Sequence, residues 1–416
     1  MMFISSQQKQ NGLTLIELLI AMLLGTLMIL GATSMFTANK RVYKEVDYQG
    51  RLAENARFAM EMIIRDLRMT GVIGCAIQQD VSNDLNVRVG AVADPTRLLS
   101  FMARTDGAVQ TNSIEGSESG AAWLPSGSTD ATVGGTAVNT GDTRVLTAAG
   151  APVVFGTQVP VTMLPTSDGF TVRFLEDTNT NLCASMTSPT GTLSAQGATG
   201  VAAAGLFLGG GVYAAADCEA TNIFQLGTSQ PGVGTPAVYT LDHGTGGTVP
   251  PGNLTGALSK QYTVSGTNCA ASPVDIMIFR ARRYFVGQDL NGSPGLYRQI
   301  FDSNPNAANV FGEFAERLID GVENMQILYG EDTTGNRIPN AYLNATAVAS
   351  WQNVVTVKLA LLFATVDEDF SAPFDTTTYQ LLNAAPFDPT PVTDDRRRRK
   401  IIEATVSLRN RQLSIN

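Results

Sequence analysis

A block of apolar residues dominates the start of the chain. After a polar segment at 1–12, residues 13–36 read LTLIELLIAMLLGTLMILGATSMF and contain one charged residue, Glu17. As a helix with a rise of 1.5 Å per residue, this block is about 36 Å long, which is enough to cross the core of a bilayer. The pattern therefore predicts a membrane-spanning helix over 13–37.

The helical pattern continues beyond the apolar block. Steps of four and three residues form one mostly apolar face: Val42, Val46, Gln49, Ala53, Ala56, Met60, Ile63 and Leu67. The opposite side is charged, with Arg51, Glu54, Arg57, Glu61, Arg65, Asp66 and Arg68. We therefore expect one helix over 13–70, whose second part, within 38–72, packs on a globular head. Gly71 and Gly74 are expected to end it.

Two regions with strand patterns follow the helix. Residues 104–270 are rich in Gly, Ala, Thr and Ser, and β-prone runs occur at 98–103, 152–154, 159–163 and 170–175. The last part has denser strand patterns, at 275–286, 295–300, 317–329, 352–364 and 399–410, with a hairpin loop at 288–292. We predict an α+β fold, in which the long helix packs on an antiparallel sheet at 271–416. A Gly-rich, β-containing insertion fills 73–270.

Composition narrows the function. The 416 residues include 28 Lys and Arg against 37 Asp and Glu, a net charge of −9. An acidic chain is poorly suited to neutralising phosphates, so no nucleic-acid partner is expected. With one histidine, His243, the chain also disfavours histidine metal sites and histidine acid–base chemistry. We expect His243, which lies among glycines and threonines, to be an exposed loop residue.

Glu17 is unusual because a carboxylate inside an apolar segment costs several kcal/mol unless it finds a partner. Cleavage after Gly12 would create an α-amine on Leu13, and in a helical array this amine could neutralise the Glu17 of a neighbouring subunit. The simpler alternatives are a signal anchor or a secretory signal. A secretory signal is cleaved after a shorter apolar region, whereas the best break here lies before it, at Gly12.

Residues 12–21, GLTLIELLIA, resemble the type III signal of type IV prepilins and pseudopilins. The resemblance implies that prepilin peptidase removes a leader at 1–12 and that the new terminus, Leu13, is N-methylated. Leu13 departs from the usual Phe of this family. The resemblance to prepilins also implies an inner-membrane anchor with a periplasmic C-terminus. The basic residues that follow the span would by themselves place the C-terminus in the cytoplasm, but the cleavage motif overrules that count.

The C-terminal third resembles the PilW family of minor pilins at 283–286, 295–298, 318–325, 328–330, 351–355 and 408–411. Cys75, after the helix, is also similar. The resemblance implies a non-enzymatic subunit that helps to prime type IV pilus assembly near the tip. Its partners would be other minor pilins, the major pilin and a PilY-type adhesin. The alternatives are a J-type minor pseudopilin of type II secretion and a tip-exposed binding protein whose middle region contacts surfaces.

The four cysteines, Cys75, Cys183, Cys218 and Cys269, allow three pairings. No C-x-x-C sequence occurs, which disfavours a zinc ribbon or a thioredoxin-type site. In an exported chain we expect disulfides. Our expected pairs are Cys183–Cys218 within the middle region and Cys75–Cys269 closing it.

The remaining candidate motifs are weak. Oxygen-rich turns at 176–179, 289–293 and 331–336 lack the calcium-loop pattern, and a G-x-G-x-x-A match at 232–237 contains a proline. No G-x-S-x-G, H-E-x-x-H or Walker A sequence occurs. We therefore expect no cofactor, no metal and no enzyme activity. The basic run at 396–400 is expected to be a solvated start of a strand, although it could meet an acidic neighbour within a pilus.

Overall fold

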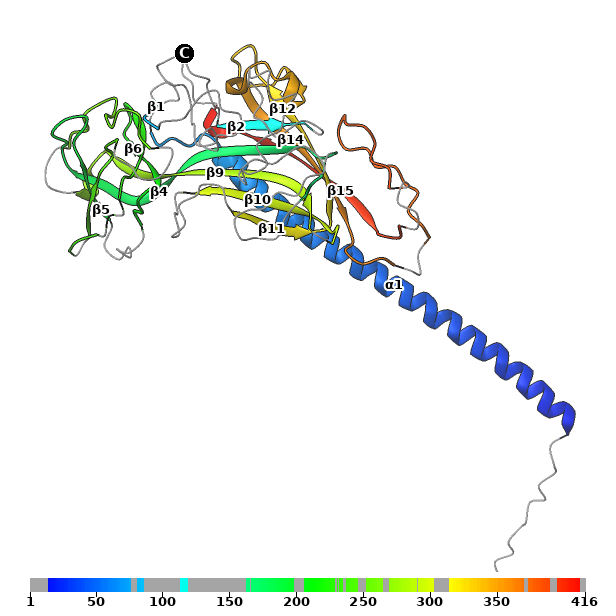
Figure 1. Cartoon of the computed structure of the whole chain (residues 1–416). Coiled ribbons are helices and arrows are strands. Elements are labelled where there is room, and N and C mark those ends of the chain that lie inside the picture. The colour runs from blue at the N-terminus through cyan, green and yellow to red at the C-terminus, as the bar shows by residue number, and fades with distance from the viewer. Residues whose placement is uncertain are drawn as a thin grey trace, which may run out of the picture.

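The computed structural model describes residues 14–75, 81–85, 113–118, 162–164, 166–197, 206–228, 230, 232–234, 237–245, 252–264, 269–289, 291–302, 314–369, 373–389 and 395–411. One long helix, α1 (Leu15–Met69), leads into a β-rich head (Figure 1). Its 55 residues are about 82 Å long. The single predicted helix is thus confirmed, and Gly71 and Gly74 follow it with φ of 76° and 85°, as expected of residues that end a helix.

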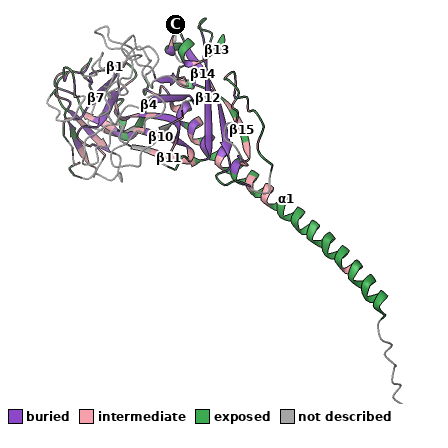
Figure 2. Cartoon of the chain, turned by 45° about the vertical axis from the view of Figure 1, so that its right-hand side comes forward, coloured by how far each residue is buried: buried purple, intermediate pink, exposed green. Residues whose placement is uncertain are grey.

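The head covers only the last part of α1. The buried residues of α1 are Leu52, Ala56, Ala59, Met60, Ile63, Asp66 and Leu67. The predicted apolar face is therefore confirmed from Ala56 onward and wrong before it, because Val42 and Val46 are 63% and 65% exposed. Figure 2 shows the reason, since the head begins at about the middle of the helix.

Within the described residues, the strands form two sheets. The larger has eleven strands, of which seven follow the order β1-β7-β6-β9-β4-β5-β8. Their bounds are β1 (Val81–Asn83), β4 (Gly169–Ala184), β5 (Leu193–Gly197), β6 (Val212–Ala216), β7 (Thr221–Gln225), β8 (Val238–Leu241) and β9 (Asp275–Gln288). Off this path lie β2 (Ile114–Ser117), β3 (Thr162–Met163), β10 (Pro294–Asp302) and β11 (Phe314–Asp320). The smaller sheet has the order β13 (Ala341–Leu343), β12 (Val322–Glu331), β14 (Val354–Ala364) and β15 (Arg399–Ser407).

The antiparallel pair β4–β9 connects the two ends of the head. Its register runs from Phe170 opposite Tyr284 to Asn181 opposite Asp275. Strand β4 comes from the Gly-rich middle of the sequence and β9 from its last third, so both regions contribute to one sheet. At one end of the pair the two sheets and α1 enclose a shared core. At the other end, strands β5 to β8 and the segments around them surround a second core, and we call this end (residues 182–276) the distal lobe.

Most strands of the last third match the sequence prediction. The runs at 275–286, 295–300 and 352–364 are β9, β10 and β14, and the predicted hairpin loop lies between β9 and β10. The run at 317–329 was wrongly predicted as one strand. Gly321, with φ of 76°, separates β11 from β12, which lie in different sheets. The runs at 98–103 and 152–154 fall outside the described residues.

Candidate assembly site

The free half of α1 is an uncovered apolar surface. Its large apolar side chains are mostly about half to three-quarters exposed, among them Leu15 at 78%, Met28 at 79% and Phe36 at 68%. Its most apolar stretch is long enough to cross a membrane and has no buried residue. The hydroxyls of Thr26, Thr33 and Thr37 donate hydrogen bonds to carbonyls one turn back, at Leu23, Ile29 and Ser34. These bonds satisfy the hydroxyls within the helix, so the surface suits either lipid or other apolar helices.

Glu17 lies in the first turn of this surface. Thr14 is the N-cap, and its backbone N–H and side-chain hydroxyl donate to the Glu17 carboxylate at 3.1 and 3.0 Å. The Glu17 N–H donates back to the Thr14 hydroxyl, which completes a capping box. The carboxylate is therefore oriented toward the N-terminal end of the helix. Gly12 and Leu13, the predicted cleavage site, lie outside the described residues.

Asp66 fixes the other half of α1 to the head. We expected it on the charged, solvent-facing side, but it is 1% exposed. Its carboxylate accepts two hydrogen bonds from Arg282 of β9, at 2.8 and 2.9 Å, and one from the Tyr284 hydroxyl at 2.5 Å. Arg298 of β10 lies 4.0 Å away. A position that periodicity assigns to solvent is buried because β9 and β10 supply two cations for it.

The carboxylate of Asp66 affects the pKa of the neighbouring Tyr284. Burial, together with the negative charge of Asp66, raises the pKa of the Tyr284 hydroxyl well above its ordinary value. The phenol therefore stays protonated and acts as a hydrogen-bond donor to Asp66. The helix and the head are thus joined by a satisfied polar cluster as well as by apolar packing.

The basic run at 396–400 is only partly solvated, which corrects the sequence prediction. The Arg399 side chain is 1% exposed and pairs with three carboxylates, those of Glu323, Asp375 and Asp395. Arg397 pairs with two of the same carboxylates, Glu323 at 2.9 Å and Asp395 at 2.8 Å. Strand β15 therefore begins inside an ion-pair network, and the sequence pattern alone could not indicate which of the five basic residues points inward.

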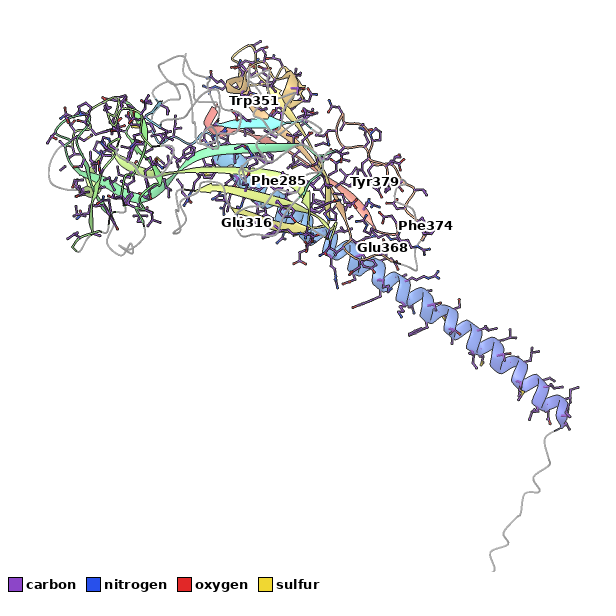
Figure 3. The ribbon with its side chains drawn as sticks, viewed as in Figure 1. Phe285, Glu316, Trp351, Glu368, Phe374 and Tyr379 are labelled. Atoms are coloured by element: carbon purple, nitrogen blue, oxygen red, sulfur yellow. A yellow bond between two sulfur atoms is a disulfide. The ribbon has the colours of Figure 1, made fainter. Side chains whose placement is uncertain are left out.

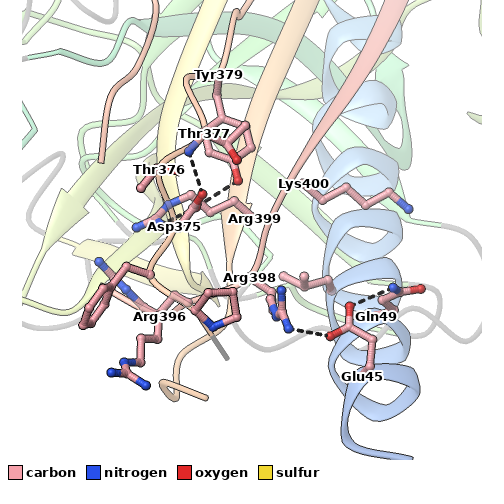
Figure 4. A pocket seen from close by; sticks show the side chains of 14 residues that line it. Glu45, Gln49, Asp375, Thr376, Thr377, Tyr379, Arg396, Arg398, Arg399 and Lys400 are labelled. Carbon is pink, nitrogen blue, oxygen red and sulfur yellow. Dashed lines mark hydrogen bonds and ion pairs between the residues drawn. The ribbon is translucent and has the colours of Figure 1, made fainter. Parts of the chain in front are cut away.

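Residues 396–400 also face α1. The guanidinium of Arg398 lies 3.1 Å from the Glu45 carboxylate (Figure 4). Nearby on the helix, Lys44 lies 3.9 Å from Asp369. In Figure 3, the loop that carries Glu368 and Phe374 lies beside α1 at the point where the helix leaves the head. This edge of the head is the part nearest to the free half of α1.

The four cysteines form two disulfides, but not the expected ones. Cys75 pairs with Cys218, and Cys183 pairs with Cys269, each with 4.5 Å between the Cα atoms. The physical reason is strand pairing. Cys183 at the end of β4 lies beside the start of β9, whose pairing with β4 brings Cys269 close. The β6–β7 turn carries Cys218 to the segment after α1.

His243 is also not where the sequence prediction placed it. It is 1% exposed within the distal lobe, its Nδ1 lies 3.1 Å from the Gly256 carbonyl oxygen, and its Nε2 lies 2.8 Å from that of Gly191. The ring therefore connects two loops in the interior. A single histidine among small residues gave no periodic signal of burial.

The oxygen-rich turns use their carboxylates internally. Asp332 accepts backbone N–H bonds from Thr334, Gly335 and Arg337, and Asp289 accepts them from Asn291 and Ser293. Among the residues that the structure describes, no cluster of three or more His, Cys, Asp or Glu residues could hold a metal ion. These carboxylates close turns, as Asx motifs commonly do.

Comparison with known families agrees with this geometry. Residues 7–33 match the prokaryotic N-terminal methylation motif, and residues 283–410 match the type IV pilus-assembly protein W family, PilW. These two matches make the chain similar to type IV pilins of the PilW family. The PilW match begins within β9 and ends just after β15, so it includes Tyr284 and Arg298 beside Asp66, but not Arg282, and it includes the arginine network. It begins after the distal lobe, which therefore lies outside the match. No curated protein and no solved structure matches the chain.

Proposed function

We propose that this chain is a non-catalytic minor subunit of the type IV pilus that helps to prime pilus assembly. The observation that carries the proposal is the combination of a PilW-like head with a helix whose apolar half has no partner in the monomer. Apolar surface of this extent must be covered by lipid or by other helices. In the membrane α1 is covered by lipid, and during assembly it is covered by the helices of other minor pilins and the major pilin.

The proposed sequence of events begins at the N-terminus. Prepilin peptidase removes 1–12, the new terminus at Leu13 is methylated, and residues 13–37 hold the protein in the inner membrane with its head in the periplasm. The Glu17 carboxylate then pairs with the N-terminus of a neighbouring subunit and fixes the register between them. Because Asp66 fixes residues 38–72 to the head, the helix and the head enter the pilus as one body. This order of segments, followed by 73–270 and 271–416, is the proposed domain plan.

We place the subunit near the tip, with a PilY-type adhesin as a further partner on the cell surface of a Gram-negative bacterium. The competing assignment within the same class is a J-type pseudopilin of type II secretion. A pseudopilin would have the same processed helix but would not be found in pili. The fraction in which the processed protein is found therefore distinguishes a pilin from a pseudopilin.

A tip-exposed binding role is a second candidate, and one observation favours it. The distal lobe has its own core, lies at the end of the head away from the free half of α1, and lies outside the PilW match (Figure 1). Two of its apolar side chains, Val233 and Leu254, are 72% and 44% exposed. Replacing both by Ser should reduce attachment while pilus number is unchanged. Ile338→Ser, at an exposed position outside the lobe, is the matched control.

Mass spectrometry of N-terminal peptides from sheared pili and from membranes tests the main proposal. An N-methylated Leu13 terminus in the pilus fraction is the expected result. A processed terminus found only in membranes would favour the pseudopilin assignment. An intact Met1 terminus in both fractions would mean that α1 acts only as a signal anchor. The Gly12→Asp variant provides the unprocessed reference.

A further inference from the structure

A cleft of about 500 Å³ lies between α1 and the edge of the head from which the helix emerges (Figure 4). Glu45 and Gln49 of α1 form one wall, and the segments 373–377 and 396–400 form the other. Glu45 comes eight residues after the end of the predicted membrane-spanning segment at 37, which is about 12 Å along the helix. The cleft therefore opens at the boundary between the part of α1 that the head covers and the part that it leaves free.

The cleft is more positive than the rest of the molecule. Its lining includes all five basic residues of 396–400 and two carboxylates, those of Glu45 and Asp375. Glu323 and Asp395, which do not line the cleft, neutralise part of this charge by pairing with Arg397 and Arg399. An excess of one positive charge remains, on a chain whose net charge is −9.

Lys400 carries the charge that is available to a ligand. It is exposed on β15 and extends toward α1, and among the described residues its ammonium group makes no hydrogen bond or ion pair (Figure 4). Arg396 belongs to the same basic run, and its guanidinium lies 4.3 Å from the centre of the Phe374 ring. The hydroxyl of Thr376 adds a donor at the same wall, whereas that of Thr377 is bonded to Asp375. Ammonium, guanidinium and hydroxyl donors together suit a carboxylate.

Position decides which carboxylate can reach the cleft. The surface of α1 next to it carries exposed apolar side chains, with Val42, Tyr43 and Val46 between 63% and 77% exposed. Under the proposed function, on which this inference rests, another pilin subunit covers that surface. We propose that the cleft receives an acidic side chain of the neighbouring pilin subunit and that Lys400 is its main contact. The contact sets which acidic segment of the neighbour lies beside residues 42–49.

Photo-cross-linking in the intact membrane tests this contact. A photoreactive phenylalanine analogue replaces Lys400 in the full chain, and the cross-linked peptide is identified by mass spectrometry. The expected adduct is an Asp- or Glu-containing segment of another pilin-like subunit. An adduct with phospholipid, or no adduct beyond the monomer, overturns the proposal. This readout does not require pili, so it remains informative even if the chain proves to be a secretion pseudopilin.

Charge reversal gives a second test. Lys400→Glu should lower the amount of processed protein in sheared pili by about fivefold or more, because an attraction becomes a repulsion. Lys400→Arg should preserve it. Arg337→Glu makes the same charge change at an exposed position in the β12–β13 turn and should have no effect. Equal incorporation of Lys400→Glu and the unmodified chain, with both present in pili, overturns the proposal, whereas absence of both from pili contradicts the proposed function instead.

Discussion

Asp66 of α1 and Arg282 of β9, which are 216 residues apart in the sequence, are joined by two hydrogen bonds of 2.8 and 2.9 Å in the buried contact between helix and head. The contact determines whether a force on the helix moves the head with it. Under the proposed function, these directional hydrogen bonds add to the apolar packing that keeps helix and head together.

Asp66→Ala should destabilise the docked state by about 3–5 kcal/mol, because Arg282 and Arg298 would remain buried without their carboxylate. Denaturant unfolding of the purified full chain in detergent measures this change. Glu61→Ala, at an exposed position on the same helix, is the control and should shift the unfolding free energy by about 0.5 kcal/mol or less. Similar values for the two variants would contradict a locking role for Asp66.

The network around Arg399 should make stability depend on acid pH. Burial alone would raise the pKa of Asp395, but hydrogen bonds from Arg397 and Arg399 outweigh it and hold that pKa well below its usual range. The pKa of Asp375 is also lowered, since hydrogen bonds from Arg399 and Thr377 outweigh its burial. Carboxyl groups with lowered pKa values stabilise the fold fully above the ordinary value of 3.8, and this stabilisation is lost as the pH falls further.

Arg399→Met should therefore be less stable than the unmodified chain at pH 7, and the gap should narrow below about pH 4 as the carboxyl groups become protonated. Unfolding free energies measured from pH 7 to pH 2 give both curves. Lys358→Met, in the adjacent strand β14 and away from these carboxylates, should run parallel to the unmodified chain. A constant gap between Arg399→Met and the unmodified chain would show that the network contributes through packing alone.

Peptide mapping without reduction should find Cys75 linked to Cys218 and Cys183 linked to Cys269. Replacing both members of the second pair by Ser should cost about 2–4 kcal/mol of unfolding free energy, because that disulfide closes a loop of 86 residues. Peptides linking Cys183 to Cys218 would instead support the pairing expected from the sequence and would place the β6–β7 turn elsewhere.

The limits of the sequence prediction have identifiable causes. Local signals sufficed for α1, with its 3.6-residue period and terminal glycines, and for the β9–β10 hairpin, with Gly292 in its loop. They failed wherever burial depends on a distant partner. Asp66 is buried because Arg282 and Tyr284 meet it, and both come from a strand more than 200 residues away. The predicted disulfide pairing was wrong for the same reason. It depends on the pairing of β4 with β9, and a sequence gives no register between distant strands.

His243 is a further case in which a distant contact decides burial. His243→Phe keeps an aromatic ring beside Phe224 but removes both ring nitrogens, so the carbonyl group, of Gly191 or Gly256, that accepts from the ring N–H loses its donor. We expect a loss of about 1–3 kcal/mol, the cost of an unsatisfied buried group. Hydrogen exchange should increase in the distal lobe and remain unchanged in α1. An increase spread evenly over the head would mean that the distal lobe does not unfold as a separate unit.

Two substitutions at Glu17 separate its two possible roles. The carboxylate caps α1 by accepting from the Thr14 N–H and hydroxyl, and we propose that it also pairs with a neighbour's N-terminus. Glu17→Gln keeps an acceptor for the capping box but removes the charge, whereas Glu17→Ala removes both. If the charge is what assembly needs, both variants should be processed normally yet be largely missing from sheared pili, as measured by quantitative mass spectrometry. If Glu17→Gln enters pili as well as the unmodified chain while Glu17→Ala does not, capping is the main role of this residue, and the proposed pairing between subunits is wrong.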